Sequence, residues 1–215
     1  MFGTATVAEA DSVTEVSGEG TDTLNFSGLT TAVTLNLGTS LIQTVHTNRT
    51  VKLSSSATFE NITGGSGDDV LFGNSANNVL NGGAGRDIVV GNSGNDTLNG
   101  EAGRDVLIGG LGLDTINGGS AYDILIAGRT TNDANVTGLI AIRTEWISGG
   151  TYASRIANLR SGVGAPVVSL KARINVLNDA GEDDVLTGGS ETDWYFKALD
   201  DVITDLFGVE ITDVL

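Results

Sequence analysis

Glycine recurs every nine residues from Gly64 to Gly118, with no insertion between copies. Seven consecutive nonapeptides fill residues 64–126, each has Asp or Asn at its sixth position, and each has an aliphatic residue at its eighth. A unit of nine residues cannot bury an apolar face by itself, so repeats of this kind stack into a solenoid in which neighbours share one core. Residues 64–126 therefore constrain the fold more than any other part of the chain.

The repeat also places oxygen ligands at regular intervals. Glycine at positions one, two and four permits left-handed backbone dihedrals and leaves the carbonyl oxygens free to converge on an ion. Carbonyl and carboxylate oxygens are the ligands that a hard cation such as Ca²⁺ prefers. If two nonapeptides form one coil, every second Asp stacks at about 4.8 Å. Two carboxylates at that spacing repel by about 3 kcal/mol at an effective dielectric near 20, and a divalent cation between them reverses the sign.

The candidate calcium ligands follow from this stacking. One edge of the solenoid carries Asp69, Asp87, Asp105 and Asp123, and the other carries Asn78, Asp96 and Asp114. The candidate turn glycines are Gly64, Gly65, Gly67, Gly82, Gly83, Gly85, Gly94, Gly100, Gly103, Gly112 and Gly119. Each gap between stacked turns is a site, so we expect about five Ca²⁺ ions. Asn78 weakens one gap because it removes a charge.

These nonapeptides match G-G-x-G-x-D-x-U-x, and the chain resembles the RTX (hemolysin-type) calcium-binding repeat proteins. The resemblance implies an all-β fold, a right-handed parallel β-roll with calcium in its turns. It also implies calcium-dependent folding, secretion to the cell exterior, and the type I secretion machinery as a partner. Arg86 and Arg104, at position five, are expected only to offset acidic crowding.

The two sheets of such a roll differ in their outward-facing positions seven and nine. Both positions are apolar in the odd-numbered nonapeptides, whereas the even-numbered ones carry mainly Thr and Asn. A large apolar face needs a cover. We expect a helical insert at residues 127–169 to pack there, beginning near a cap at Asn132 or Asp133 and including Trp146. The alternative is a separately folded subdomain or partner surface.

The remaining segments are less regular. Residues 1–63 are expected to form lead-in β-coils, and residues 170–215 a resumed roll and β cap. Within the latter, residues 175–178 repeat the sequence pattern of residues 78–81, and residues 188–196 form one more nonapeptide. Asp22 and Asp193 lie in degenerate copies, where a structural turn is favoured over calcium binding. The acidic, aliphatic C-terminus resembles a type I export signal; the alternative is a capping strand.

Composition excludes several other functions. The chain has no Cys and one histidine, His46, so thiol chemistry and two-histidine metal sites within one chain are ruled out. Its net charge of −16 disfavours nucleic-acid binding. The opening residues predict no N-terminal signal peptide, and no apolar run predicts a membrane span.

No catalytic motif is found, so we expect a protein that is not an enzyme. Two alternatives stay open beside the calcium-dependent folding and export module. One is a non-catalytic accessory module of a secreted hydrolase, lyase or epimerase. The other is a cell-surface adhesive protein, whose surface or glycan ligand the sequence does not identify.

Overall fold

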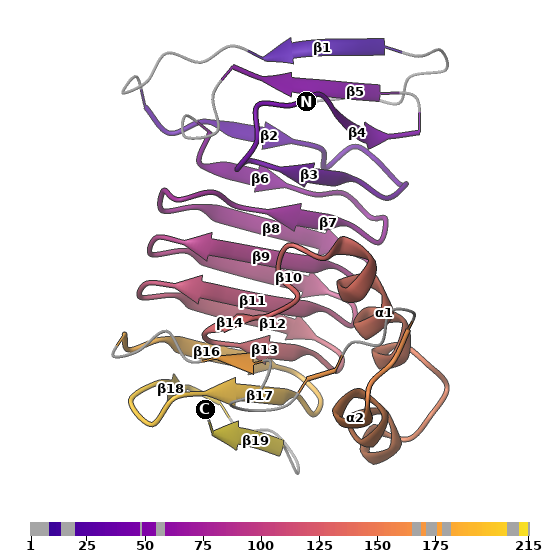
Figure 1. Ribbon diagram of the computed structural model, residues 1–215, viewed down its shortest axis with the longest axis vertical. Coiled ribbons are helices and arrows are strands. Elements are labelled where there is room, and N and C mark those ends of the chain that lie inside the picture. Colours follow the sequence, from indigo (N-terminus) through magenta and orange to yellow (C-terminus); the bar gives the residue numbers. More distant parts are fainter. Residues whose placement is uncertain are drawn as a thin grey trace.

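Two seven-stranded parallel sheets face each other and form a roll (Figure 1). The computed structural model describes residues 9–13, 20–47, 49–54, 59–164, 169–170, 176–177, 182–205 and 211–214. The polar sheet has the order β18 (Val202–Ile203), β16 (Val185–Gly189), β12 (Thr115–Ser120), β10 (Thr97–Ala102), β8 (Val79–Ala84), β6 (Asn61–Thr63), β2 (Thr23–Asn25). The apolar sheet has the order β19 (Ile211–Val214), β17 (Trp194–Lys197), β13 (Ile124–Ile126), β11 (Val106–Leu111), β9 (Ile88–Ser93), β7 (Val70–Phe72), β3 (Thr34–Asn36). The prediction of an all-β parallel roll is confirmed.

The strand register gives the size of one coil. Val70 pairs with Ile88 in the apolar sheet, and Thr97 pairs with Thr115 in the polar sheet, so neighbouring strands are 18 residues apart. One coil therefore contains two nonapeptides. After β13 the offset changes, because Ile124 pairs with Trp194, 70 residues further on. A long insert thus lies within a single coil.

The eighth position of each nonapeptide fills the space between the two sheets. Leu71, Leu80, Val89, Leu98 and Leu107 are fully buried in this core, and Ile116, Leu125, Leu186 and Tyr195 continue it. Successive side chains of a strand point to opposite faces, so positions seven and nine face outward. On the polar sheet the outward Asn99 and Asn117 form a ladder, in which Asn117 Nδ2 donates to Asn99 Oδ1 at 2.8 Å.

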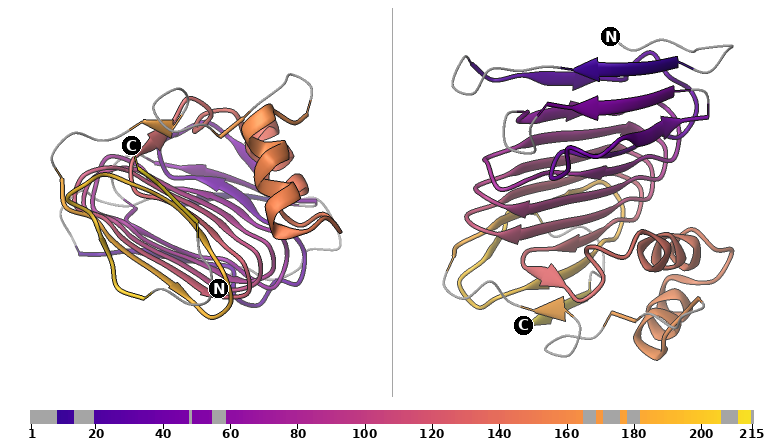
Figure 2. Two further views of the ribbon diagram at one scale, coloured as in Figure 1. Left: turned by 90° about the horizontal axis from the view of Figure 1, so that it is seen from below. Right: turned by 45° about the horizontal axis from the view of Figure 1, so that its top comes forward.

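Two helices of the insert cover the outer face of the apolar sheet. Helix α1 (Val136–Trp146) and helix α2 (Tyr152–Ser161) lie on one flank of the roll (Figure 2). Their buried side chains form a second core with the outward residues of β7, β9, β11, β13 and β17. Its members include Leu139, Ile142 and Trp146 from α1 and Ile108 and Ile126 from the sheet, all fully buried.

The N-terminal cap of α1 lies later than the sequence suggested. Asn135 caps the helix, and its Oδ1 accepts a hydrogen bond from Gly138 N at 3.0 Å. The expected caps, Asn132 and Asp133, belong to the preceding turn, where Asp133 Oδ2 accepts from Thr130 N at 2.9 Å. Because its carboxylate is bonded within that turn, Asp133 does not cap the helix.

Polar contacts tie the insert to several coils. Arg143 Nη1 donates to Asp69 O at 3.2 Å and to Arg86 O at 2.8 Å, near the start of the repeat array. At the other end, Arg160 forms an ion pair of 2.8 Å with Asp213 in β19. The insert therefore bonds to both the first and the last coils along the covered flank.

Smaller sheets lie outside the two main ones. Strands β1 (Glu9–Val13), β5 (Arg49–Leu53) and β4 (Gln43–His46) form a three-stranded sheet beyond the first coil (Figure 1). β14 (Arg129–Thr130) and β15 (Val176–Leu177) form an antiparallel pair. The expectation that residues 175–178 continue the roll is therefore wrong for the two described residues, Val176 and Leu177. Their strand pairs with the start of the insert, and the roll resumes at Asp184, which bonds to the preceding coil.

Candidate metal centre

Hydrogen bonds join the sixth-position side chains into two ladders, one along each edge of the roll. In the first ladder Asp69 N donates to Asp87 Oδ1 at 2.8 Å, and Asp87 N donates to Asp105 Oδ1 at 2.7 Å. The ladder continues through Asp123 to Asp193, with distances of 2.8 and 2.7 Å. Each carboxylate thus bonds to the coil before it through one oxygen.

The second ladder follows the opposite edge. Asn78 N donates to Asp96 Oδ1 at 2.7 Å, and Asp96 N donates to Asp114 Oδ1 at 2.8 Å. Asp114 N donates to Asp184 Oδ1 at 2.6 Å, across the insert. The seven sixth-position residues predicted from the sequence all lie in the two ladders.

Three ladder members were missed as site candidates. Asp184 and Asp193 extend the second and first ladders, and Asp201 accepts from Asp184 N at 3.2 Å. The nonapeptide at residues 188–196 contained the signal for Asp193, which the sequence assigned to a structural turn. Asp184 begins the segment Asp184-Val-Leu-Thr187, which has the strand register of the repeats. Its ladder partner, Asp114, lies 70 residues earlier, so this local pattern did not indicate the pairing.

The second carboxylate oxygen is the unusual feature of both ladders. Oδ2 of Asp87, Asp96, Asp105 and Asp123 is buried and accepts no hydrogen bond. A buried charged oxygen without a partner is costly, and each such atom calls for an explanation. Four equivalent atoms repeated at the same position indicate a built feature of the turn.

The first glycine of each nonapeptide admits this oxygen. A Cβ on Gly82 would lie 2.5 Å from Asp87 Oδ2, and one on Gly100 would lie 2.5 Å from Asp105 Oδ2. Gly91 and Gly118 stand in the same relation to Asp96 and Asp123. Any side chain at position one would therefore displace the carboxylate.

Backbone carbonyls enter the gap between coils from both sides. The oxygens of Gly65 and Gly67 lie 2.3 and 2.2 Å from where a Cβ on Gly83 and Gly85 would stand. From the following coil, the oxygen of Gly82 lies 2.2 Å from a Cβ position on Gly64. Position-four glycines on both edges repeat this contact, with Gly103 against Gly85 O and Gly112 against Gly94 O, and at position two Gly119 lies against Glu101 O. Each glycine turn thus presents carbonyl oxygens beside a carboxylate.

This arrangement fits a hard cation that takes most of its ligands from the backbone. Across the described ranges, no three acidic or histidine side chains lie close enough together to hold a metal ion through side chains alone. A carboxylate with converging carbonyls is the donor set that Ca²⁺ accepts. The residues present therefore fit calcium, with the backbone supplying the larger share of oxygens.

The electrostatics of the ladders point the same way. Burial, together with repulsion from Asp105, raises the pKa of Asp87 to about 8. Burial also raises the pKa of Asp96 and of Asp105 to about 7, and that of Asp123 well above its ordinary value. These carboxylates resist ionisation in the metal-free roll, since the interior solvates their charge poorly.

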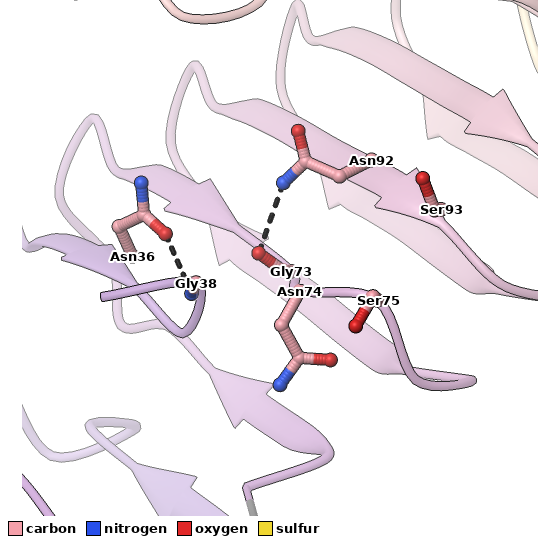
Figure 3. Close-up of a pocket in the computed structure, with 7 residues that line it drawn as sticks. All are labelled: Asn36, Gly38, Gly73, Asn74, Ser75, Asn92 and Ser93. Carbon is pink, nitrogen blue, oxygen red and sulfur yellow. Dashed lines mark hydrogen bonds between the residues drawn. The ribbon is translucent and has the colours of Figure 1, made fainter. Parts of the chain in front are cut away.

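The first gap of the second ladder is built differently. Asn78 is an amide, and its Nδ2 donates to Glu60 O at 2.8 Å. Asn92 Nδ2 donates across the gap to Gly73 O at 2.9 Å, beside a hollow lined by neutral polar groups (Figure 3). The side-chain amides of Asn78 and Asn92 thus each donate a hydrogen bond to a backbone carbonyl oxygen of the preceding coil.

Comparison with known families agrees with this geometry. The model of the RTX calcium-binding nonapeptide repeat (4 copies) matches residues 56–89, 63–98 and 90–125. The match confirms the resemblance seen in the nonapeptides. No curated protein matches the chain. Among the described residues, no helix is long and apolar enough to cross a membrane.

Proposed function

Because the chain carries RTX calcium-binding repeats, we propose that its two ladders hold Ca²⁺ between successive coils and that binding completes the folding of the roll. The observation that carries this proposal is the set of buried, unbonded Oδ2 atoms of Asp87, Asp96, Asp105 and Asp123. When bound, calcium supplies the positive charge that lets these carboxylates ionise in the interior.

The ladders suggest a larger number of ions than the five expected from the sequence. The first ladder has four gaps between aspartates, from Asp69 to Asp193. The second has two between Asp96 and Asp184. We exclude the gap between Asn78 and Asp96, because Asn78 has no charge and Asn92 bridges the turns. We therefore propose about six sites. The second ladder ends at Asp201, whose two carboxylate oxygens accept hydrogen bonds from Asp184 N and Ala198 N.

Folding depends on calcium because burying the carboxylates without the ion lowers the stability of the roll. The chain must bury stacked carboxylates whose pKa values are raised to about 7 or 8. Extracellular calcium modules commonly bind at about 10⁻⁴ to 10⁻³ M. Each ion that binds only the folded state adds stability according to its concentration relative to Kd, so several weak sites give a steep response.

Circular dichroism in EDTA followed by calcium titration tests this function. We expect little β signal in EDTA and a cooperative rise at submillimolar to millimolar Ca²⁺. Mg²⁺ at the same concentrations is the control, since it demands smaller octahedral geometry and retains its waters. A full β spectrum in EDTA that calcium leaves unchanged would contradict the proposal.

Secretion is the second part of the proposal. RTX repeat proteins are typically secreted. A chain that folds only at millimolar calcium would stay extended inside the cell and fold outside it, which suits passage through a type I secretion channel. Expression beside a type I exporter should place the protein in the medium, and an exporter lacking its ATPase activity is the control. Equal amounts of the protein in the medium with the active exporter and with the inactive exporter would contradict the secretion part of the proposal.

A further inference from the structure

Four arginines gather on the flank of the first ladder, in a chain that has 11 basic and 27 acidic residues. Arg86 and Arg104 stand at position five of their nonapeptides, and Arg143 and Arg155 come from the two helices. Arg143 Nη1 donates to Asp69 O and Arg86 O, and Arg155 Nη1 donates to Trp146 O at 2.5 Å. The helical pair is therefore engaged with backbone carbonyls.

Arg86 and Arg104 are engaged differently. In the described part of the chain neither guanidinium forms an ion pair within 4.0 Å, although Asp68 Oδ1 accepts a hydrogen bond from Arg86 N at 3.1 Å. Their expected role of offsetting acidic crowding stays a prediction. The Arg104 guanidinium instead lies 5.2 Å from the centroid of the Tyr122 ring, and Arg155 lies 5.4 Å from the same centroid. Stacking on an aromatic ring fixes a guanidinium while leaving its N–H donors at the rim available.

The two arginines line one hollow in the surface. It encloses about 360 Å³, and its other walls are Gly85, Gly103, Ala121 and Ile147. Gly85 and Gly103 have no side chains that could fill the hollow, and Ile147, at the C-terminal end of α1, contributes an apolar side chain to its lining. None of the six lining residues is acidic.

We propose that this hollow binds an oxyanion, a sulfate, phosphate or carboxylate group, between Arg86 and Arg104. The planar fork of a guanidinium matches such groups, because two parallel N–H donors meet two oxygens. The two residues occupy the same position in successive coils, about 4.8 Å apart along the roll. That spacing lets both guanidinium groups contact one oxyanion.

Calcium should order this site. Arg86 precedes Asp87 and Arg104 precedes Asp105, so both arginines belong to turns of the first ladder. This calcium dependence rests on the proposed function, whereas the anion site itself rests on the hollow and its arginines.

The test is a titration of the full chain at saturating calcium, after circular dichroism has shown that it is folded. Sodium sulfate and a sulfated disaccharide are the probes, with the unsulfated disaccharide as a blank. The readout is the set of arginine Nε–Hε signals in the NMR spectrum. We expect saturable shifts of the Arg86 and Arg104 signals. Saturation by sulfate indicates a site for a free oxyanion, and saturation by the disaccharide alone indicates an oxyanion carried on a saccharide; both support the site.

Variants separate the site from general charge. Arg86→Gln and Arg104→Gln should each weaken binding by about 10-fold or more, and Arg104→Lys should weaken it because the fork is lost. Arg129→Gln, on an exposed strand of the insert, removes the same charge and should leave the affinity unchanged. Shifts that do not saturate with either probe, or equal losses in Arg129→Gln, would overturn the proposal. Calcium binding is measured separately, so its failure is distinguishable from failure of the anion site.

Discussion

Asp87 Oδ1 accepts the backbone N–H of Asp69, 18 residues earlier, at a distance of 2.8 Å, while Asp87 Oδ2 accepts no hydrogen bond. The two oxygens of one carboxylate therefore have different tasks. Oδ1 fixes the stacking of neighbouring coils, and Oδ2 lies 2.5 Å from the Cβ position of Gly82, the first glycine of its own turn. Substitutions that keep one oxygen and alter the charge can separate structure from ion binding.

Asp105→Asn should make that separation. The amide retains an oxygen to accept from Asp87 N, whose bond to Asp105 Oδ1 is 2.7 Å, but it lacks the negative charge. We expect calcium affinity at the adjacent gaps to fall by about 10-fold or more, since ligand charge sets the strength of such sites. Isothermal titration calorimetry measures this change.

Asp200→Asn is the matched control for that experiment. Asp200 lies on an exposed turn near the C-terminal end of the roll. The substitution should leave both the number of ions and their affinity unchanged. If Asp105→Asn binds calcium as the wild type does, the ladder carboxylates do not hold the ion.

The effect of pH on stability should reverse when calcium is added. The pKa values of Asp87, Asp96 and Asp105 are raised from 3.8 to about 8, 7 and 7 in the metal-free fold. The folded state then binds more protons than the unfolded state between about pH 4 and 8, so metal-free stability falls as pH rises through that window. Each carboxyl contributes a slope of up to about 1.4 kcal/mol per pH unit.

With calcium bound, the same carboxylates are ionised in the folded state. Protons then compete with the ion, and stability should rise with pH. Circular dichroism at pH 5 and pH 8 in metal-depleted buffer measures the residual β structure, and thermal unfolding at the same two pH values at saturating calcium measures the second trend. Metal-free protein that has more β structure at pH 8 than at pH 5 would show that the buried carboxylates do not control folding.

Much of the roll could be read from the sequence because its pattern is local. The period of nine fixed the coil, and the difference between positions such as Ile108 and Asn99 distinguished the two outer faces. Elements that depend on distant contacts were harder to predict. Asp184 joins the second ladder across 70 residues, and no local pattern encodes the length of an insert. Val176 and Leu177 have the repeat's sequence, yet their strand pairs with β14.

A methyl group at the first position of a turn should disrupt the site and the fold together. In Gly100→Ala the new Cβ would lie 2.5 Å from both Asp105 Oδ2 and Gly118 O. A backbone carbonyl cannot move aside as a flexible side chain can, so we expect a loss of about 3 kcal/mol in the presence of calcium. Gly149→Ala is the control, because nothing lies within 4 Å of its Cβ position. Equal urea midpoints for the two variants would contradict the tight turn.

A charge beneath the helices should release the insert. Ile108 is fully buried in the second core with Trp146, so Ile108→Asp should destabilise the protein by about 4 kcal/mol and shift Trp146 emission to longer wavelength. The measurement uses a Trp194→Phe background, which leaves Trp146 as the one tryptophan. Thr115→Asp, exposed on the polar sheet, is the control. An unchanged spectrum for Ile108→Asp would mean that the helices do not depend on this face.

Glu191 replaces the glycine expected at the fourth position of the nonapeptide at residues 188–196, and its backbone conformation is strained. It occupies position four, where most of the turns have a positive φ, and its own φ is 77°. A residue with a Cβ loses roughly 1–2 kcal/mol in that region, whereas glycine adopts it freely. Glu191→Gly should therefore stabilise the calcium-bound roll by about 1 kcal/mol, after allowing for the greater entropy of glycine in the unfolded chain. Glu182→Gly removes the same charge from a residue outside the positive-φ set and should be neutral or destabilising. Calcium-saturated urea unfolding compares them, and a destabilised Glu191→Gly would show that the Glu191 side chain contributes more than its backbone strain costs.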